Sequence, residues 1–290
     1  MEWLDNEMVL RINNDNVPVQ FLKPDFNIDV EEDVSYIKSI WFRKGGYTKL
    51  SNSINNNQII NHATEELYTL SRFFYTKHPY LKSLGTTEYL TMNKLSVLSA
   101  LNQSGLSIPA TLVTGNKDKL SEFVNKHKDV IVKPLSEGLK FESDGQYFKV
   151  YTERLTEELF NSLEETFFPT LFQKLILRSY EIRSFYLNKK IYSMAIFLPR
   201  DKELEIDHRI HVQSNDVRMM PYQLPDNIED KMRSTMKLLG LDTGSFDIVK
   251  DVNGNLIFLE INPSGQFGGL SSVCNYYLER AIGNYLKNEA

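Results

Sequence analysis

The clearest alternation of hydrophobic and polar residues lies near the C-terminal end of the chain. Two segments, residues 246–250 and 255–261, place apolar side chains at alternating positions, and the dipeptide Asn253-Gly254 lies between them. Side chains alternate between the two faces of a strand, so each segment is predicted to be a β-strand. Asn-Gly is typical of a two-residue type I′ turn, and the whole stretch is therefore predicted to be a β-hairpin.

The register of this hairpin decides which side chains meet. With a two-residue loop, Val252 pairs with Asn255, and counting outward along both strands places Asp247 directly opposite Glu260. Asn262 lies two residues beyond Glu260 and projects from the same face, because side chains repeat with period two. Two carboxylates and an amide oxygen are therefore predicted to converge on one face of the sheet.

The pairing of Asp247 with Glu260 has an electrostatic cost. Like charges directly opposite each other destabilise a sheet, and at such range one acid normally keeps its proton. A bound cation removes that cost. Oxygen ligands without His or Cys favour Mg²⁺ or Mn²⁺, and Mg²⁺ in proteins usually binds together with nucleotide phosphates. The alternative is an exposed hairpin face that carries solvated acids.

The N-terminal part of the chain has a mixed α/β pattern. Residues 8–12 and 39–43 are strand-like, whereas residues 58–75 place apolar side chains every three or four positions, as a helix does. These elements predict a small α/β lobe over residues 1–90. Its helix-like beginning is unusual for such a lobe, and we expect that a leading strand is missing from the sequence.

The rest of the chain alternates between short helices and strands. In order, the pattern predicts a helix over 93–105, strands after Pro109 and over 131–134 and 146–151, a helix over 156–165, strands over 171–177, 181–187 and 191–198, and helices over 226–240 and 271–287. This succession predicts an α/β protein with α+β lobes.

Three of these helices carry specific expectations. The first is expected to turn three leucines inward, Leu95, Leu98 and Leu101. Asp226 and Glu229 have the Asp-x-x-Glu spacing that caps a helix N-terminus. The last helix is expected to pack through Val273, Tyr277 and Ile282.

Two further sites carry charged residues on predicted strands. Lys133 ends the buried strand that begins at Ile131, and it is either a surface lysine or a cation that needs an anionic partner such as phosphate. Glu181 and Arg183 share one face of the next long strand. They form either an ion pair on the surface or a pair that positions the ribose and phosphate of a nucleotide.

Composition limits the class of protein. The chain has 290 residues, of which 41% are hydrophobic and 24% charged, and a net charge of −5. These values predict a globular protein and argue against a general nucleic-acid binder. No apolar run approaches the roughly 20 residues that span a bilayer, and no secretory signal begins the chain. A single cysteine, Cys274, fits a reducing compartment, so we expect a cytoplasmic protein without membrane contact.

The order of several short motifs resembles a known superfamily. In sequence these are Asn93-Lys94 before a helix that ends in GLSIPATLVT, Ile131-Val-Lys133-Pro134, Gln173-Lys-Leu-Ile176, Glu181-Ile-Arg183, Asp207-x-Arg209, Asp247, and LEINPSGQFG. Together they cover nearly the whole chain and resemble the ATP-grasp ligases. The phrases WFRKG, YEIRSFYL and EINPSGQFGGL are most similar to the ATP-grasp maturases of ribosomally made peptides, which include the microviridin-type or graspetide macrocyclases and the grasp-with-spasm ligases.

This resemblance implies an ATP-grasp fold with three lobes and ATP between the central and C-terminal lobes. The expected boundaries are 1–90 for the N-terminal lobe, 91–172 for the linker helix and central lobe, and 173–290 for the C-terminal lobe. It also implies roles for particular residues. Those expected to contact ATP are Lys94 and Lys133 at the phosphates, Gln173, Lys174, Leu175 and Ile176 at the adenine, Glu181 at the ribose and Arg183 at the transferring phosphate. Those expected to bind metal are Asp247, Glu260 and Asn262, and Arg209, placed by Asp207, is expected to face the substrate.

The activity that the resemblance implies is carboxylate activation. ATP, with Mg²⁺ or Mn²⁺, is expected to phosphorylate a side-chain carboxylate of a precursor peptide that carries a leader. A hydroxyl or amine of the same peptide then forms an ester or amide crosslink. A glutamate-adding or small-molecule ligase is the alternative with the same ATP chemistry, and a non-catalytic nucleotide-gated peptide-binding protein is a third. A homodimer is a family-based expectation. Two features depart from the family pattern: the stretch 134–147, which would cover the phosphates, has only two glycines, and Gly269 stands where related ligases often have an aromatic residue.

Overall fold

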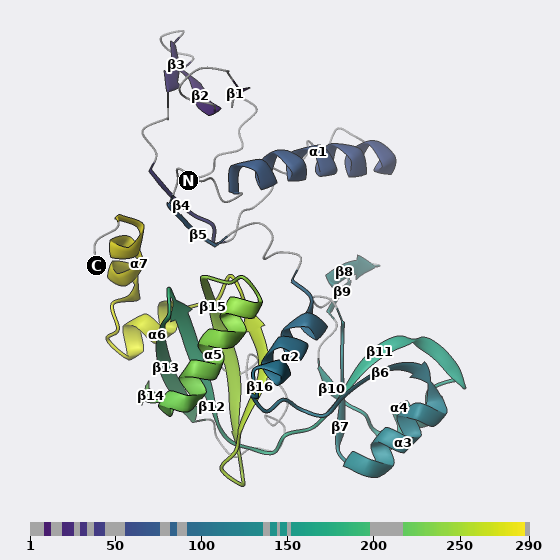
Figure 1. Ribbon diagram of the computed structural model, residues 1–290. Coiled ribbons are helices and arrows are strands. Elements are labelled where there is room, and N and C mark those ends of the chain that lie inside the picture. Colours follow the sequence, from purple (N-terminus) through teal and green to yellow (C-terminus); the bar gives the residue numbers. More distant parts are fainter. Residues whose placement is uncertain are drawn as a thin grey trace. The chain divides into compact units, whose positions relative to one another are not determined.

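The structure is a computed structural model in which the chain divides into two compact units (Figure 1). One unit comprises Met1–Thr91 with Glu279–Ala290, and the other comprises Met92–Leu278. The residues that the structure describes are 9–12, 19–25, 30–33, 38–43, 56–75, 82–85, 92–135, 140–143, 146–149, 152–197 and 217–287.

The first unit combines a small antiparallel sheet with a βαβ arrangement. Its antiparallel sheet has the order β1-β2-β3, formed by β1 (Val9–Ile12), β2 (Val19–Asp25) and β3 (Val30–Asp33). Strands β4 (Ser39–Trp41) and β5 (Lys82–Leu84) pair in parallel, and helix α1 (Asn57–Tyr75) lies between them in the sequence. The strands expected over 8–12 and 39–43 and the helix over 58–75 are confirmed.

The last helix joins this first unit. Helix α7 (Leu278–Lys287) belongs to it from Glu279 onward, and the Lys82 ammonium lies 4.3 Å from the centre of the Tyr285 ring. The expected single helix over 271–287 is wrong. Helix α6 (Gly268–Val273) ends first, and Asn275 and Tyr277 have positive φ angles of 54° and 51°, which no α-helix accepts.

The packing residues expected in this C-terminal segment are only partly correct. Ile282 is buried in α7, as expected. Val273 and Tyr277, however, are 45% and 63% exposed, because the break between the two helices ends the periodicity that relates them to Ile282.

The second unit contains two larger sheets, of which the first is four-stranded. Its order is β10-β7-β11-β6, and its strands are β6 (Thr111–Asn116), β7 (Val130–Lys133), β10 (Glu153–Arg154) and β11 (Thr166–Lys174). Helices α3 (Lys117–His127) and α4 (Glu157–Ser162) lie side by side against it (Figure 1). A separate hairpin pairs β8 (Lys140–Ser143) with β9 (Gln146–Lys149), and it begins inside the stretch 134–147 that was expected to cover the phosphates.

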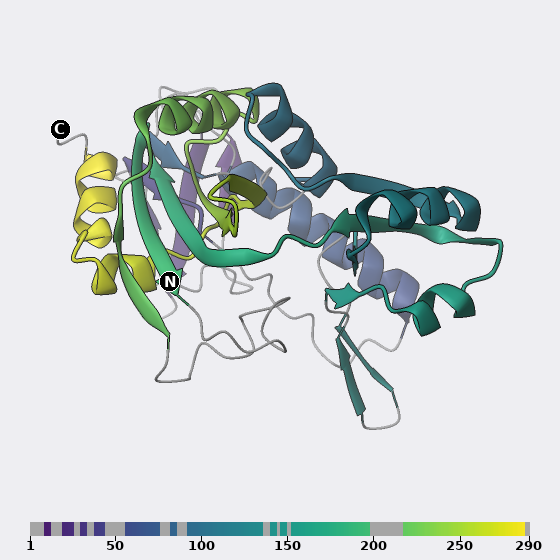
Figure 2. The ribbon, with the colours of Figure 1, turned by 90° about the horizontal axis from the view of Figure 1, so that it is seen from below.

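The second sheet is five-stranded and wholly antiparallel. Its order is β14-β13-β12-β15-β16, formed by β12 (Arg178–Leu187), β13 (Lys190–Phe197), β14 (Arg218–Tyr222), β15 (Thr243–Asp251) and β16 (Leu256–Asn262). Helix α5 (Asp226–Leu238) packs on one face through the fully buried Met232 and Met236, and α2 (Lys94–Gln103) lies beside α5 (Figure 2). Phe246 on β15 and Phe258 on β16 are also buried, and their ring centres lie 6.2 Å apart in an edge-to-face contact.

Helix α2 differs from its expected orientation at one residue. The helix ends as expected, with Gly105 at a φ of 74°, and Asn93 caps its start by accepting the Leu95 N–H at 2.7 Å. Leu98 and Leu101 are buried, but Leu95 is 36% exposed and Val97 is buried instead. Leu95 lies in the first turn, and the buried side chains come from the later turns of the helix.

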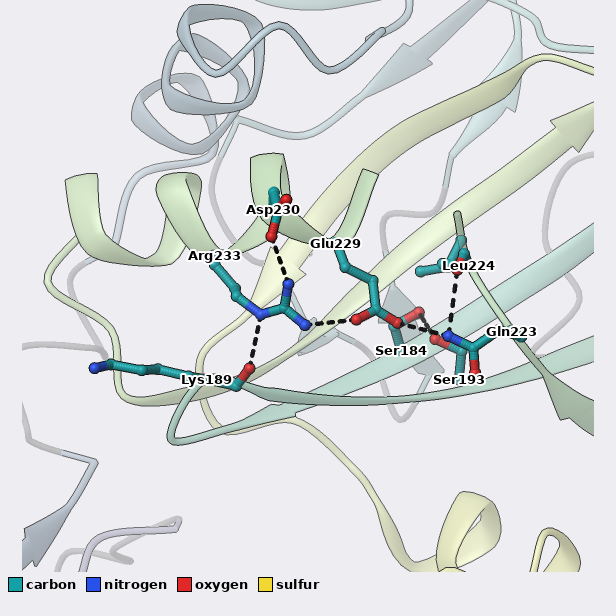
Figure 3. A network of polar contacts seen from close by, with 8 residues as sticks. All are labelled: Ser184, Lys189, Ser193, Gln223, Leu224, Glu229, Asp230 and Arg233. Atoms are coloured by element: carbon teal, nitrogen blue, oxygen red, sulfur yellow. Dashed lines mark hydrogen bonds and ion pairs between the residues drawn. The ribbon is translucent and has the colours of Figure 1, made fainter. Parts of the chain in front are cut away.

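Helix α5 lacks the expected cap. Its N-cap is Pro225, which makes no side-chain capping hydrogen bond, and Asp226 is already helical. Glu229 instead accepts hydrogen bonds from Arg233 at 2.6 Å and from Gln223 Nε2 at 3.2 Å (Figure 3). Arg233 also donates to the Lys189 carbonyl oxygen at 2.9 Å, so this network ties α5 to the turn between β12 and β13 (Figure 3).

Candidate functional site

The tip of the β15–β16 hairpin differs from the expected two-residue turn. Lys250 pairs with Leu256, and the Asp251 N–H donates to the Asn255 carbonyl oxygen at 2.9 Å, which leaves a loop of three residues, 252–254. Gly254 has a φ of 84°, as the third residue of such a loop requires. The Asp251 carboxylate accepts the backbone N–H groups of Asn253 and Asn255, at 2.9 and 2.7 Å, and these bonds favour the longer loop.

The hydrogen bonds at this tip affect the acidity of Asp251. The pKa of the Asp251 carboxyl is lowered, first by the hydrogen bond from the Asn255 side chain and then by backbone N–H groups. The charged carboxylate is therefore the form that holds the loop, because each donor stabilises negative charge.

A β-bulge in β16 restores the pairing that the sequence predicted. Ile248 pairs with Phe258, whereas the preceding residue of β15, Asp247, pairs with Glu260. Leu259 therefore has no partner of its own in this ladder. The extra residue compensates for the longer loop. Without it, Glu260 would lie on the opposite face, because a shift of one residue exchanges the faces of a strand. The predicted pairing of Asp247 with Glu260 is thus confirmed.

Arg183 extends this pair into a row across three strands. It lies opposite Asp247 on β12, and its Nε donates to Asp247 Oδ1 at 2.9 Å. The Arg183 and Asp247 side chains are 23% and 25% exposed, so both remain partly open to solvent. Asn262 pairs with Ser245, two residues from Asp247, and so shares the face. The structure therefore brings together the four residues that were expected at the metal and the transferring phosphate.

The donor set fits a hard divalent cation. Among the residues that the structure describes, no three or more His, Cys, Asp or Glu side chains form a metal-binding group. The candidate is instead two carboxylates with the Asn262 amide oxygen. That oxygen accepts the Ser264 N–H at 3.0 Å, and because an amide oxygen has two lone pairs it retains capacity for a cation.

The connection between the two sheets is the segment expected to hold adenine. Gln173 is buried, and its Nε2 donates to Thr111 Oγ1 at 3.0 Å. The N–H groups of Lys174 and Leu175 donate to backbone carbonyl oxygens of two neighbouring segments, each at 2.9 Å. Strand β11 ends at Lys174 and β12 begins at Arg178. These bonds therefore fix the backbone where the connection between the sheets begins, and this connection, residues 175–177, is called the hinge below. The roles of Gln173 through Ile176 toward adenine stay predictions.

The two candidate phosphate-binding lysines approach the end of β7 from different elements. Lys133 is the last residue of β7, and Lys94 is the first residue of α2. The Lys94 ammonium donates to the carbonyl oxygen of Pro134, the residue that follows Lys133, at 3.0 Å. Residues 39 positions apart in the sequence are therefore brought to one end of the four-stranded sheet.

The segment after β16 lies against the same face as Asp247. A Cβ atom at Gly265 would lie 2.4 Å from Ser245 Oγ and 2.6 Å from the Ser245 backbone nitrogen, and Ser245 shares the face of Asp247. Phe267 continues the contact, with its ring centre 5.2 Å from that of Phe185. Only glycine permits this approach.

Replacing Gly265 by Ala is expected to displace this segment from the sheet. We expect a loss of about 1–3 kcal/mol in the free energy of unfolding, the usual effect of overpacking, measured by urea denaturation. The matched control is Gly268→Ala, because a Cβ there meets no atom within 4 Å. Equal stability of the two variants would contradict the close approach.

Some predicted residues cannot be placed. Asp207 and Arg209, expected at the substrate, lie outside the described residues. The structure also adds one residue that sequence reasoning missed: Arg178 Nη1 lies 2.9 Å from Glu181 Oε1. A spacing of three puts two residues on opposite faces of a regular strand, so periodicity gave no signal for this pair.

No helix in the described part of the chain combines the length and apolar character needed to cross a membrane.

No protein-family model matches the chain. Among curated proteins, the α-aminoadipate–LysW ligase LysX of Sulfurisphaera tokodaii is 24% identical over 207 residues, which are 67% of this chain and 68% of that protein.

Two solved structures resemble the whole chain. The macrocyclase MdnC of Microcystis aeruginosa, bound with the precursor peptide MdnA, is 25% identical with a TM-score of 0.81, and the match covers 100% of this chain and 90% of MdnC. A RiPP-associated ATP-grasp ligase of Chryseobacterium gregarium, in complex with ADP and a leader and core peptide, shares the fold with a TM-score of 0.83 at 22% identity, covering 100% and 87%. The expected ATP-grasp fold is thus confirmed. The chain is an ATP-grasp ligase, similar along its whole length to the ATP-grasp macrocyclases of ribosomally made peptides.

Proposed function

We propose that this ligase forms side-chain ester or amide crosslinks in a ribosomally made precursor peptide, through an acyl phosphate. The observation that carries the proposal is the full-length similarity to MdnC, together with the row formed by Arg183, Asp247 and Glu260. The substrate is a peptide with a leader and a core that supplies both a carboxylate and a hydroxyl or amine. A short gene next to that of the ligase, encoding a Thr/Ser- and Asp/Glu-rich peptide, would supply it.

The residues divide into three groups along the bound nucleotide. Gln173 through Ile176 are proposed to hold the adenine through backbone groups, and Glu181 the ribose. Lys94, Lys133 and Arg183 are proposed to balance the charge of the phosphates. The two lysines place their cations at the end of β7, and Arg183 places its cation beside Asp247. Arg209, placed by Asp207, is proposed to bind the substrate carboxylate.

Asp247, Glu260 and Asn262 are proposed to hold Mg²⁺, or Mn²⁺ in its place. The bound ion supplies charge neutralisation at the phosphate oxygens. The carboxylate pair supports this, since two facing acids are stabilised by a cation between them. The Arg183 guanidinium, whose Nε donates to Asp247 Oδ1, contributes part of the same charge compensation.

The reaction follows from these positions in two transfers. A carboxylate oxygen of the core peptide attacks the γ-phosphorus of ATP, the bond to the bridging oxygen breaks, and ADP leaves. A hydroxyl or amine of the same peptide then attacks the acyl carbon, its proton passes to solvent, and phosphate leaves with the oxygen from the carboxylate. The chain's contribution is positioning and charge balance, chiefly by Arg183 and the two lysines.

The similarity to LysX favours a second candidate, the ligation of a free amino acid to a carboxylate. Both candidates use the same nucleotide site and an acyl phosphate. They differ in the nucleophile, which belongs to the same peptide in one case and to a second molecule in the other.

Oxygen transfer tests the proposed chemistry. A precursor peptide labelled with ¹⁸O in its core carboxylates is expected to pass one labelled oxygen to the released phosphate for each bond formed. A matched peptide with Asn and Gln in place of the core Asp and Glu should release no phosphate. Peptide-dependent release of unlabelled phosphate would contradict acyl-phosphate formation.

Three wider assignments complete the proposal. The lobes are proposed to divide at 1–90, 91–172 and 173–290. The protein is proposed to act in the cytoplasm, which its single cysteine supports, without nucleic acid or membrane as a partner. It is further proposed to form a homodimer, which size-exclusion chromatography with light scattering tests.

A further inference from the structure

A second β-bulge lies in β12, on the other side of β15 from the bulge at Leu259. Tyr180 pairs with Lys250, whereas Arg178 pairs with Asp251, so Ser179 has no partner in the β12–β15 ladder. Strand β15 thus pairs with one bulged strand on each side. Each bulge adds one residue to the neighbouring strand and so exchanges the faces of the residues beyond it.

The bulge turns Arg178 onto the face that carries the candidate site. Asp247, Val249 and Asp251 lie on one face of β15 because their positions differ by two. Their partners on β12 are Arg183, Glu181 and Arg178 respectively. Paired residues in an antiparallel ladder project from the same face, so the two arginines and Glu181 share it.

The pair that results is well shielded from solvent. Arg178 Nη1 lies 2.9 Å from Glu181 Oε1, and their side chains are only 11% and 12% exposed. The Arg183 and Asp247 side chains, in the next row, are 23% and 25% exposed. A shielded ion pair with a hydrogen bond holds its two side chains far more firmly than a surface pair does.

The pair of Arg178 and Glu181 lies between the hinge and the facing acids Asp247 and Glu260. Leu177, the last residue of the hinge, accepts the Val252 N–H at 3.1 Å and directly precedes Arg178. Glu181 lies two residues, or about 6.8 Å, before Arg183 on the strand. A nucleotide with its base at the hinge and its phosphates at Asp247 and Glu260 would therefore place its ribose beside Glu181.

We propose that Arg178 is a positioning residue that holds the Glu181 carboxylate toward the ribose hydroxyls of the nucleotide. The proposal rests on the assignment of Glu181 to the ribose within the proposed function. The guanidinium engages one carboxylate oxygen, Oε1, and thereby orients the other toward the sugar. Arg178 itself does not contact the nucleotide.

Ribose discrimination is the property that separates this role from a purely structural one. ADP, 2′-deoxy-ADP and 3′-deoxy-ADP differ only in the hydroxyls that Glu181 is proposed to accept. Binding is measured by equilibrium titration with Mg²⁺ and without peptide. Failure of peptide crosslinking therefore leaves the result unaffected.

The variants isolate the charge of Arg178. Arg178→Met keeps most of the aliphatic stem without the charge, Arg178→Gln keeps a neutral donor, and Arg178→Lys keeps a cation that reproduces a single contact to Oε1. The matched control is Arg233→Met, which removes a 2.6 Å ion pair with Glu229 on α5, on the other face of the same sheet. Thermal melting identifies the variants that fold.

The wild type and Arg233→Met are expected to bind ADP at least about tenfold more tightly than one of the deoxy analogues, as the loss of a hydrogen bond to a charged group implies. In Arg178→Met and Arg178→Gln the preference should fall to about twofold or less, and Arg178→Lys should restore most of it. A wild-type preference in either folded uncharged variant would overturn the proposal. The proposal would also be overturned if Arg178→Lys lost the preference for ADP as fully as the uncharged variants do, or if the wild type showed no preference for ADP over either deoxy analogue.

Discussion

Replacing Glu260 by Gln is expected to lower ATP-dependent crosslinking by about 10²–10³-fold or more, because the proposed metal site loses one of its two carboxylates, Asp247 and Glu260. The variant is expected to fold, since Gln has the shape of Glu. Removal of a like charge opposite Asp247 should leave the metal-free protein equally stable or up to about 1 kcal/mol more stable. Peptide-dependent ADP release and thermal melting measure the two effects.

The control for this variant is Glu122→Gln, on the exposed face of α3, where Glu122 forms an ion pair with the solvent-exposed Lys119. It should keep full activity. Mg²⁺ with ADP is expected to raise the melting temperature of the wild type and of this control, but much less that of Glu260→Gln. Full activity of Glu260→Gln would contradict the metal assignment.

Replacing Phe258 by Ala is expected to lower the free energy of unfolding by about 3–5 kcal/mol, the usual loss for a large aromatic residue in a core. The Phe258 side chain is 0% exposed and contacts the Phe246 ring edge-to-face. Its N–H donates to the Ser107 carbonyl oxygen at 2.8 Å, a bond that Ala retains, so the loss comes from packing alone. Urea denaturation measures it.

Val252→Ala is the matched control for this core variant. Val252 lies in the loop of the same hairpin and is 61% exposed, so its truncation should change stability by less than about 0.5 kcal/mol. A Phe258→Ala variant as stable as this control would contradict the placement of β16 against α2.

The pairing of Asp247 with Glu260 was predictable from the sequence, although the turn was not. Alternation identified both strands, and Asn253-Gly254 indicated a tight connection. The loop is one residue longer than expected because the Asp251 carboxylate binds its backbone N–H groups. The bulge at Leu259 cancels this extra residue, so the burial of one face and the polarity of the other, not the turn type, decided the register.

Other features of the site had no signal in the sequence. No residue type in the sequence marks the bulge at Ser179, so the ion pair between Arg178 and Glu181 could not be predicted from strand alternation. The meeting of Lys94 with Pro134 depends on tertiary packing between α2 and the end of β7. The expected cap of α5 is absent because Glu229 instead binds Arg233, one turn further along the same helix, and Gln223, which precedes the helix.

The intact mass of the precursor peptide after incubation with this protein, ATP and Mg²⁺ tests the central claim most directly. We expect losses in steps of about 18 Da, one water for each bond formed by carboxylate activation, and no loss when ATP is omitted. A gain of one amino-acid residue would instead assign the protein to the ligases that add a free amino acid. An unchanged peptide with intact ATP would contradict the proposed crosslinking.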